Sequence, residues 1–227
     1  MSAVISLTTI PSRIEHIESC IDSLLSQGLP VYLWVQTTNI VTGAVLERIP
    51  PFLEGKQGLT VTKVEARGPI TKLLPAFEAG HQQVITADDD HSYGAHWAEG
   101  LIGWQLKHPD SAVCYRGRIF DSSKRYNKSE VVRKTHRLVE LITSVSGVIY
   151  RRGFFGAAIF EEWKKWPIND DIVISAHLKR RNVPMRVIPI PKGCSLTRLS
   201  TAHIAPLYAI NVKQNKNDEG LAKVFWK

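Results

Sequence analysis

The segment VITADDD at residues 84–90 places three aspartates directly after a short apolar run. Residues 84–87 have the composition of a buried strand. Three adjacent carboxylates repel one another and resist burial unless a cation compensates them. Because side chains alternate along an extended backbone, Asp88 and Asp90 are expected on one side and Asp89 on the other. The segment therefore predicts a strand that ends in a two-carboxylate grip for Mg²⁺ or Mn²⁺, with a solvated turn or a helix cap as the alternative.

The chain before this segment alternates between apolar runs and helical patterns. The expected strands are residues 3–7, 31–35 and 59–64, and the expected helices are residues 12–25 and 71–79. Ser12 and Glu15 match a capping box for the first helix, and Gly28 follows its end.

The chain after the segment predicts strands at residues 112–115, 144–150 and 185–190 and a helix at residues 170–181. Residues 116–137 are basic and poor in apolar periodicity, so a mobile excursion is expected there. The alternation favours one α/β domain over residues 1–227, a three-layer α/β/α sandwich with a mixed, mainly parallel central sheet. Ligands of such sheets bind beyond the carboxyl ends of the strands, which would place Thr8 and residues 88–90 at one edge.

The charge balance indicates an anionic partner. The chain has 227 residues, with 29 Lys and Arg against 21 Asp and Glu, and a formal net charge of +8. Nucleotide diphosphates, nucleic acids and acidic lipid headgroups would all be attracted to such a surface, so charge alone does not separate them.

Cysteine use and the start of the chain bear on location. Cys20, Cys114 and Cys194 form no C-x-x-C pair, which favours buried thiols over disulfides or a zinc site. No stretch approaches the ~20 apolar residues of a membrane span, and residues 1–7 lack the features of a secretory signal. We therefore expect a cytoplasmic protein, with peripheral contact at the inner membrane face as one use of its basic surface.

Five segments together resemble GT-A glycosyltransferases, particularly small bacterial and large-virus (chlorella-virus-type) enzymes. The resemblance extends over roughly residues 3–190 and is carried by ISLTTIPSR (5–13), GPITKL (68–73), the D-x-D strand at 84–90 with Trp97 after it, SGVIY (146–150) and NDDI (169–172). It implies a GT-A fold and a metal-dependent, inverting glycosyltransferase. The expected donor is a nucleotide-sugar, with UDP as the expected nucleotide, and the expected acceptor is a hydroxyl of a glycan or glycolipid.

The resemblance also implies roles for residues of the donor site. Thr8, Thr9 and Arg13 would line the nucleotide pocket, and Lys72 would meet ribose or phosphate oxygens. The acidic run would divide its work: Asp88 would approach the ribose or the metal, Asp89 the sugar hydroxyls, and Asp90 the Mn²⁺ or Mg²⁺ ion directly.

The later segments are expected to complete the site. Of the pair Asp170 and Asp171, the second would act as general base, with capping of the helix as the alternative. Ser146 and Gly147 would allow the backbone to approach the sugar or acceptor closely. Relatives often use a later histidine as a metal ligand, and His203 is the candidate in this chain.

Two other functions compete with this interpretation. A metal-dependent nucleotidyltransferase also needs carboxylates and a nucleotide pocket, but no glycine-rich phosphate loop is evident in the sequence. A noncatalytic nucleic-acid-binding module would rest on the basic residues 116–137 and 179–181, and the acidic run would oppose a polyanion. No nucleic-acid partner is therefore expected, while the sequence leaves the oligomeric state open.

Overall fold

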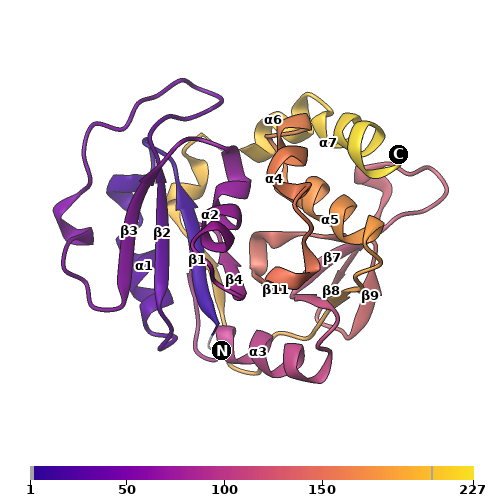
Figure 1. Cartoon of the computed structure of the whole chain (residues 1–227), viewed down its shortest axis with the longest axis horizontal. Coiled ribbons are helices and arrows are strands. Elements are labelled where there is room, and N and C mark those ends of the chain that lie inside the picture. The colour runs from indigo at the N-terminus through magenta and orange to yellow at the C-terminus, as the bar shows by residue number, and fades with distance from the viewer. Residues whose placement is uncertain (1–2, 206) are drawn as a thin grey trace.

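A mixed eight-stranded sheet forms the centre of the computed structural model, which describes residues 3–205 and 207–227 (Figure 1). The strands in spatial order are β3 (Leu59–Val64), β2 (Val31–Gln36), β1 (Val4–Thr9), β4 (Gln83–Ala87), β11 (Val148–Arg151), β6 (Ala112–Cys114), β12 (Met185–Val187) and β9 (Arg137–Val139). Strands β1 to β4 are parallel, β11 is antiparallel to both its neighbours, β12 is parallel to β6, and β9 is antiparallel to β12. The predicted mixed, mainly parallel sheet is confirmed, since β11 and β9 alone run against the other strands of this sheet.

Helices cover both faces of the sheet. Side chains of α1 (Glu18–Leu25) and α3 (Trp97–Lys107) share one buried apolar cluster with alternate residues of the strands, such as Ile5 and Leu7. Side chains of α2 (Leu74–Glu78), α4 (Ile159–Glu162) and α5 (Asp170–Arg180) share a second cluster with Val4 and Val84. The two clusters on opposite faces make the three-layer α/β/α sandwich that the sequence predicts.

Shorter elements complete the described residues. The short helical turns are η1 (Ile14–His16), η2 (Pro51–Leu53), η3 (Gly68–Lys72), η4 (Tyr126–Lys128), η5 (Ser144–Ser146), η6 (Arg152–Phe154), η7 (Trp163–Lys165), η8 (Ser200–His203) and η9 (Leu221–Phe225). The C-terminal helices are α6 (Leu207–Lys213) and α7 (Lys216–Gly220), and β5 (His91–Tyr93) pairs with β13 (Leu196–Arg198). Within the described residues, every helix is too short or too polar to cross a bilayer.

The first predicted helix is divided in the structure. The turn η1 comes first, and α1 begins only at Glu18 with Ile17 before it, so the predicted capping box at Ser12 and Glu15 is wrong. The segment turns earlier because the Arg13 amide donates to the Ile10 carbonyl, at 2.9 Å. This turn directs the Arg13 side chain towards the end of β4, where it forms an ion pair described below.

Residues 116–137 contain β-strands and the helical turn η4, where the sequence predicts a mobile excursion. β7 (Arg116–Ile119) pairs with β8 (Glu130–Arg133) on one side and with β10 (Leu141–Ile142) on the other. This three-stranded sheet has few buried apolar side chains. One of them is Val132, which is 3% exposed and belongs to the apolar cluster that also contains Val4 and Val84. A helical or alternating apolar pattern is therefore weak in the sequence, although the backbone is fully paired along β7.

Candidate active site

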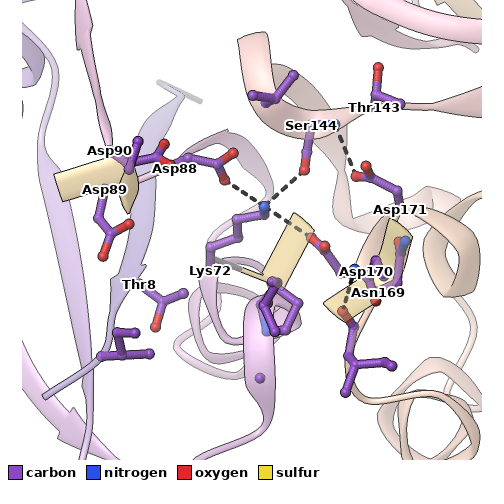
Figure 2. A pocket seen from close by; sticks show the side chains of 18 of the residues that line it. Thr8, Lys72, Asp88, Asp89, Asp90, Thr143, Ser144, Asn169, Asp170 and Asp171 are labelled. Carbon is purple, nitrogen blue, oxygen red and sulfur yellow. Dashed lines mark hydrogen bonds and ion pairs between the residues drawn. The ribbon is translucent and has the colours of Figure 1, made fainter. Parts of the chain in front are cut away.

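A cavity of about 720 Å³ lies at the carboxyl ends of β1 and β4, where parallel α/β sheets usually bind ligands. Segments distant in sequence meet there (Figure 2). The polar residues that line it include Thr8, Thr9, Arg13, Lys72, Asp88, Asp89, Asp90, His91, Arg116, Arg118, Tyr126, Thr143, Ser144, Asn169, Asp170, Asp171 and Arg198. The predicted placement of Thr8 and the three aspartates at one edge of the sheet is confirmed.

The Lys72 ammonium joins the two acidic segments at the centre of the cavity. Its Nζ lies 2.7 Å from Asp88 Oδ1, 2.8 Å from Ser144 Oγ and 3.0 Å from Asp170 Oδ2 (Figure 2). The side chain is only 4% exposed. Burial opposes the charged form, but Asp170 and Asp88 outweigh it and raise the pKa of Lys72 above its ordinary value. Lys72 is therefore a permanent cation that holds η3, β4, η5 and α5 together.

Asp89 anchors the acidic edge, by which we mean residues 88–90, to the loop after β1. Its Oδ2 accepts a hydrogen bond from Thr9 Oγ1 and its Oδ1 one from Arg13 Nη1, each at 2.6 Å. Burial raises the pKa of Asp89, although the Arg13 guanidinium and the Thr9 hydroxyl act in the opposite direction. Both oxygens are thus engaged within the protein, and the side chain points away from those of Asp88 and Asp90 (Figure 2).

Asp90 faces a group of basic side chains. Its Oδ1 lies 2.6 Å from His91 Nδ1, and its Oδ2 lies 3.9 Å from Arg13 Nη1. Burial opposes ionisation of Asp90, but the His91 hydrogen bond and the charges of Arg13 and Arg198 hold its pKa below the ordinary value. The pairing of β5 with β13 sets Arg198 opposite His91, and the Leu199 amide donates to the Asp90 carbonyl at 2.8 Å. Asp90 is therefore an ionised carboxylate whose Oδ2 makes a longer contact, to Arg13, than the one that Oδ1 makes to His91.

The acidic edge fits a cation whose coordination shell is completed by the substrate, and it does not fit a cation that is coordinated by protein side chains alone. Among the described residues, no group of three or more His, Cys, Asp or Glu side chains is arranged to hold a metal ion. Asp88 and Asp90 are each committed to a short contact through Oδ1. Their Oδ2 atoms, of which that of Asp90 lies 3.9 Å from Arg13 Nη1, are the oxygens that would ligate a cation. Mg²⁺ or Mn²⁺ commonly takes its remaining ligands from phosphate oxygens and water.

Asp170 and Asp171 lie at the first turn of α5 but do not cap it. The cap is Asn169, whose Oδ1 accepts from the Ile172 amide at 3.2 Å and whose Nδ2 donates to Asn217 Oδ1 at 2.8 Å. Asp170 is buried against Lys72. Helix capping was the alternative role for the acidic pair, and Asn169 has that role instead.

Asp171 occupies the wall opposite the acidic edge. Its Oδ1 accepts a hydrogen bond from the Ser144 amide at 2.9 Å. Burial, reinforced by the neighbouring charge of Asp170, raises the pKa of Asp171 to about 7, while Lys72 and Ser144 limit the rise. The carboxyl group therefore changes protonation near neutral pH, which suits proton transfer.

Three residues expected at the site lie elsewhere. Ser146 and Gly147 do not line the cavity; the Ser146 carbonyl accepts from Trp97 Nε1 at 2.8 Å. Gly147 has φ of 104°, and a Cβ there would lie 2.5 Å from the Trp97 ring, so glycine serves packing against Trp97. His203 is exposed and is not among the lining residues.

The structure brings in residues that sequence reasoning missed. Ser144 reaches Lys72 because residues 144–146 form a turn, whereas the sequence predicts a continuous strand over 144–150. His91 directly follows the acidic run, so its place in the sequence already indicated that it lies near the site. Arg116 and Arg118 line the cavity from β7, and their i, i+2 spacing around Gly117 was a strand signal within the segment predicted to be irregular.

Comparison with known proteins identifies the fold. No protein-family model matches the chain, and no curated protein matches it. Among solved structures, it is similar to that of GalNAc-T7 with UDP, GalNAc and Mn²⁺, with 12% sequence identity and a TM-score of 0.57. The match covers 97% of this chain and 50% of the other, so the chain spans about half the length of that protein. The chain therefore has a GT-A glycosyltransferase fold.

Proposed function

We propose that this chain is a metal-dependent glycosyltransferase that moves a sugar, with inversion, from a nucleotide-diphosphate donor to a hydroxyl of a glycan or glycolipid. The observation that carries the proposal is the Lys72 junction. One buried ammonium joins a carboxylate of the acidic edge to the acidic pair of α5, across a cavity at the carboxyl end of the sheet. A donor bound at one wall and a base on the other would thereby be fixed relative to each other.

The donor is assigned to the acidic edge and the loop after β1. Asp88 and Asp90 supply the oxygens for Mg²⁺ or Mn²⁺, which when bound offsets the negative charge of a departing diphosphate. Thr8 and Arg13 line the same end of the cavity. The similar solved structure holds UDP and Mn²⁺, which supports UDP as the nucleotide to test first.

Asp171 is assigned as the general base. A carboxyl group with a pKa of about 7 is substantially ionised at neutral pH and still basic enough to accept a proton. In the transfer, the acceptor O–H proton goes to Asp171, the acceptor oxygen bonds to the anomeric carbon, and the bond from that carbon to the diphosphate oxygen breaks. The electron pair of the broken bond leaves with the diphosphate, and attack from the opposite face inverts the anomeric centre.

The products of the reaction test this proposal. A glycosyltransferase releases a nucleoside diphosphate, whereas a nucleotidyltransferase releases pyrophosphate. Asp171→Asn keeps an oxygen that can accept from the Ser144 amide, so this variant should bind donor normally and lose transfer by about a hundredfold or more. Asp110→Asn, at an exposed position outside the cavity lining, is the matched control and should transfer sugar as the wild type does. Normal transfer by Asp171→Asn would reject the base assignment.

A further inference from the structure

Two arginines of β7 lie in the wall of the cavity that also holds Asp171. Arg116 and Arg118 both line it, and alternation puts their side chains on one face of the strand. Gly117 between them faces the other way, because a Cβ there would lie 2.7 Å from Val139 Cγ2. We call Arg116 and Arg118 the arginine pair.

The arginine pair lacks carboxylate partners. Within the part of the chain that the structure describes, neither side chain forms an ion pair with Asp or Glu. Arg118 Nη1 donates to two neutral oxygens, the Tyr126 carbonyl at 3.1 Å and Ser129 Oγ at 2.9 Å. Its guanidinium stacks over the Tyr126 ring at 3.9 Å.

Burial leaves this positive charge uncompensated. The Nε atoms of both arginines are shielded from solvent and have no hydrogen-bond partner among the described residues. Burial, together with repulsion from Arg118 and from Arg133 on the neighbouring strand, lowers the pKa of Arg116, although Tyr126 and Asp171 act in the opposite direction without outweighing it. Desolvated like charges at close range are unfavourable unless an anion joins them. The cavity therefore has a basic wall suited to an anionic ligand group.

Asp171 on the same wall acts on Arg116 through its charge but forms no ion pair with either arginine, and the other acidic groups near β7 are committed to other partners. Glu130 of β8 pairs with Arg137 at 2.6 Å, and Glu140 accepts from the Phe120 amide at 2.7 Å. An anion in direct contact with the arginine pair would thus come from outside the chain. A guanidinium binds a carboxylate or phosphate through charge-assisted hydrogen bonds, and the Nη atoms of Arg116 with Nη2 of Arg118 are the donors that remain for such a group.

The position of the arginine pair indicates which substrate carries the anion. The Thr143 amide donates to the Arg116 carbonyl at 3.1 Å, and the next amide, that of Ser144, donates to Asp171. The pair is therefore attached to the segment that holds the proposed base. Lys72 lies between that segment and the acidic edge and contacts both. The group that approaches the base is the acceptor.

We propose that the acceptor is anionic, carrying a carboxylate or phosphate that binds the arginine pair while its hydroxyl faces Asp171. This inference rests on the proposed function, because it needs a donor at the acidic edge. It adds a chemical class to the acceptor: a uronic acid, a sugar phosphate or a phosphate-bearing glycolipid would fit, and a neutral glycan would leave the arginine pair without its counter-charge.

Anion titrations of the full chain test the subsite without requiring turnover. Glucuronate and inorganic phosphate, with neutral glucose as control, are added while the side-chain Nε–H signals of Arg116 and Arg118 are followed by NMR. Both anions should move these signals in a saturable way, and glucose should not. Arg116→Gln/Arg118→Gln should weaken anion binding at least about tenfold. Arg116→Lys, which keeps the charge but not the planar fork, should fall between that variant and the wild type.

Arg133→Gln is the matched control, because it removes one charge at an exposed position opposite Arg116 and outside the cavity lining. It should retain anion binding within about twofold of the wild type. Absence of saturable anion binding to the wild type would overturn the proposal. An equal loss in Arg133→Gln and in the double glutamine variant would also overturn it, since the effect would then reflect net charge alone.

A second titration in the presence of saturating UDP and Mn²⁺ separates acceptor from donor. Anion binding should persist when the nucleotide is bound. Displacement of the anions by UDP would assign the arginine pair to the donor diphosphate and overturn the acceptor assignment. If UDP does not bind with Mn²⁺, the proposed function fails and takes the acceptor assignment with it. If UDP binds and the anions do not, the subsite alone is rejected.

Discussion

The acidic edge and the arginine pair carry opposite charges in one cavity, and they differ in how that charge is compensated. Each aspartate of the acidic edge has a basic partner: Lys72 for Asp88, Arg13 for Asp89 and His91 for Asp90. Among the described residues, Arg118 of the arginine pair has only neutral partners, and the Arg116 side chain forms no ion pair or hydrogen bond. Both sets lie along the same cavity, so the difference comes from their partners.

This difference separates preorganisation from recognition. Compensated charges at the acidic edge are held in fixed positions before any substrate arrives, which is what a reaction centre requires. Uncompensated charges of the arginine pair are unfavourable in the free protein and gain most when a ligand supplies the missing anion. Variants at the two places should therefore behave differently, in stability as well as in activity.

Lys72→Met should have the largest effect. It leaves the buried Asp170 and the partly exposed Asp88 without their shared cation, and loss of one partner from a buried ion pair such as Lys72 with Asp170 costs about 3–5 kcal/mol. Denaturant unfolding should show this loss together with loss of transfer. Lys63→Met on β3 is the control, because Lys63 is exposed, and it should change the free energy of unfolding by less than about 0.5 kcal/mol. Similar stability of the two variants would contradict the claim that Lys72 holds the two acidic segments together.

The pH dependence of transfer should reveal Asp171, which lies between the two walls. The base acts when ionised, so kcat/KM should fall about tenfold for each pH unit below the pKa of about 7 and level off above it. A pH–rate profile of the wild type measures this. A profile that is flat from about pH 5 to about pH 8 would contradict the assignment.

Because of Asp171, the free energy of unfolding should fall as pH rises, whereas transfer activity should increase. Its pKa in the folded protein is about 7 against an ordinary value of 3.8, so between these values the folded state binds more protons than the unfolded state. The contribution of Asp171 to stability is therefore fully present below 3.8 and is lost as pH rises through 7. Asp171→Asn should remove this slope, and unfolding of both proteins across the same pH range would measure it.

Arg116→Gln should have the smallest effect on stability. It removes a charge that is partly desolvated and unpaired, so the free energy of unfolding should stay within about 0.5 kcal/mol of the wild type or rise slightly. Thermal unfolding in buffer without phosphate or carboxylate anions is the measurement. A loss of several kcal/mol, like that of Lys72→Met, would show that the two walls do not differ as described.

The sequence predicts the parallel strands of the central sheet well because β2 is almost wholly buried and β3, at the edge, keeps an alternating pattern. Residues 31–36 and 59–64 were predicted almost to their ends, and α5 to within one residue. The acidic edge also follows from the sequence, since aspartates after a buried strand must lie at its carboxyl end. Local composition was sufficient wherever it coincided with burial.

The rest depends on tertiary contacts that local patterns do not encode. Ser12 and Glu15 match a capping box, but the ion pair between Arg13 and Asp89 belongs to a turn that displaces the helix start to Glu18. The basic residues 116–137 suggest an irregular segment, yet β7 is held by backbone pairing on both sides. The role of Ser144 arises from a turn before β11, which no pattern in the segment indicated.

Calorimetric titration of UDP, with and without Mn²⁺, tests the central claim most directly. The wild type should bind UDP at least about tenfold more tightly with Mn²⁺, because the cation links the diphosphate to the acidic edge. Asp90→Asn should abolish this dependence, while Asp110→Asn, outside the cavity lining, should keep it. If UDP bound equally well with and without Mn²⁺, or if Asp90→Asn kept the full Mn²⁺ effect, the acidic edge would not be a cation site for a nucleotide donor.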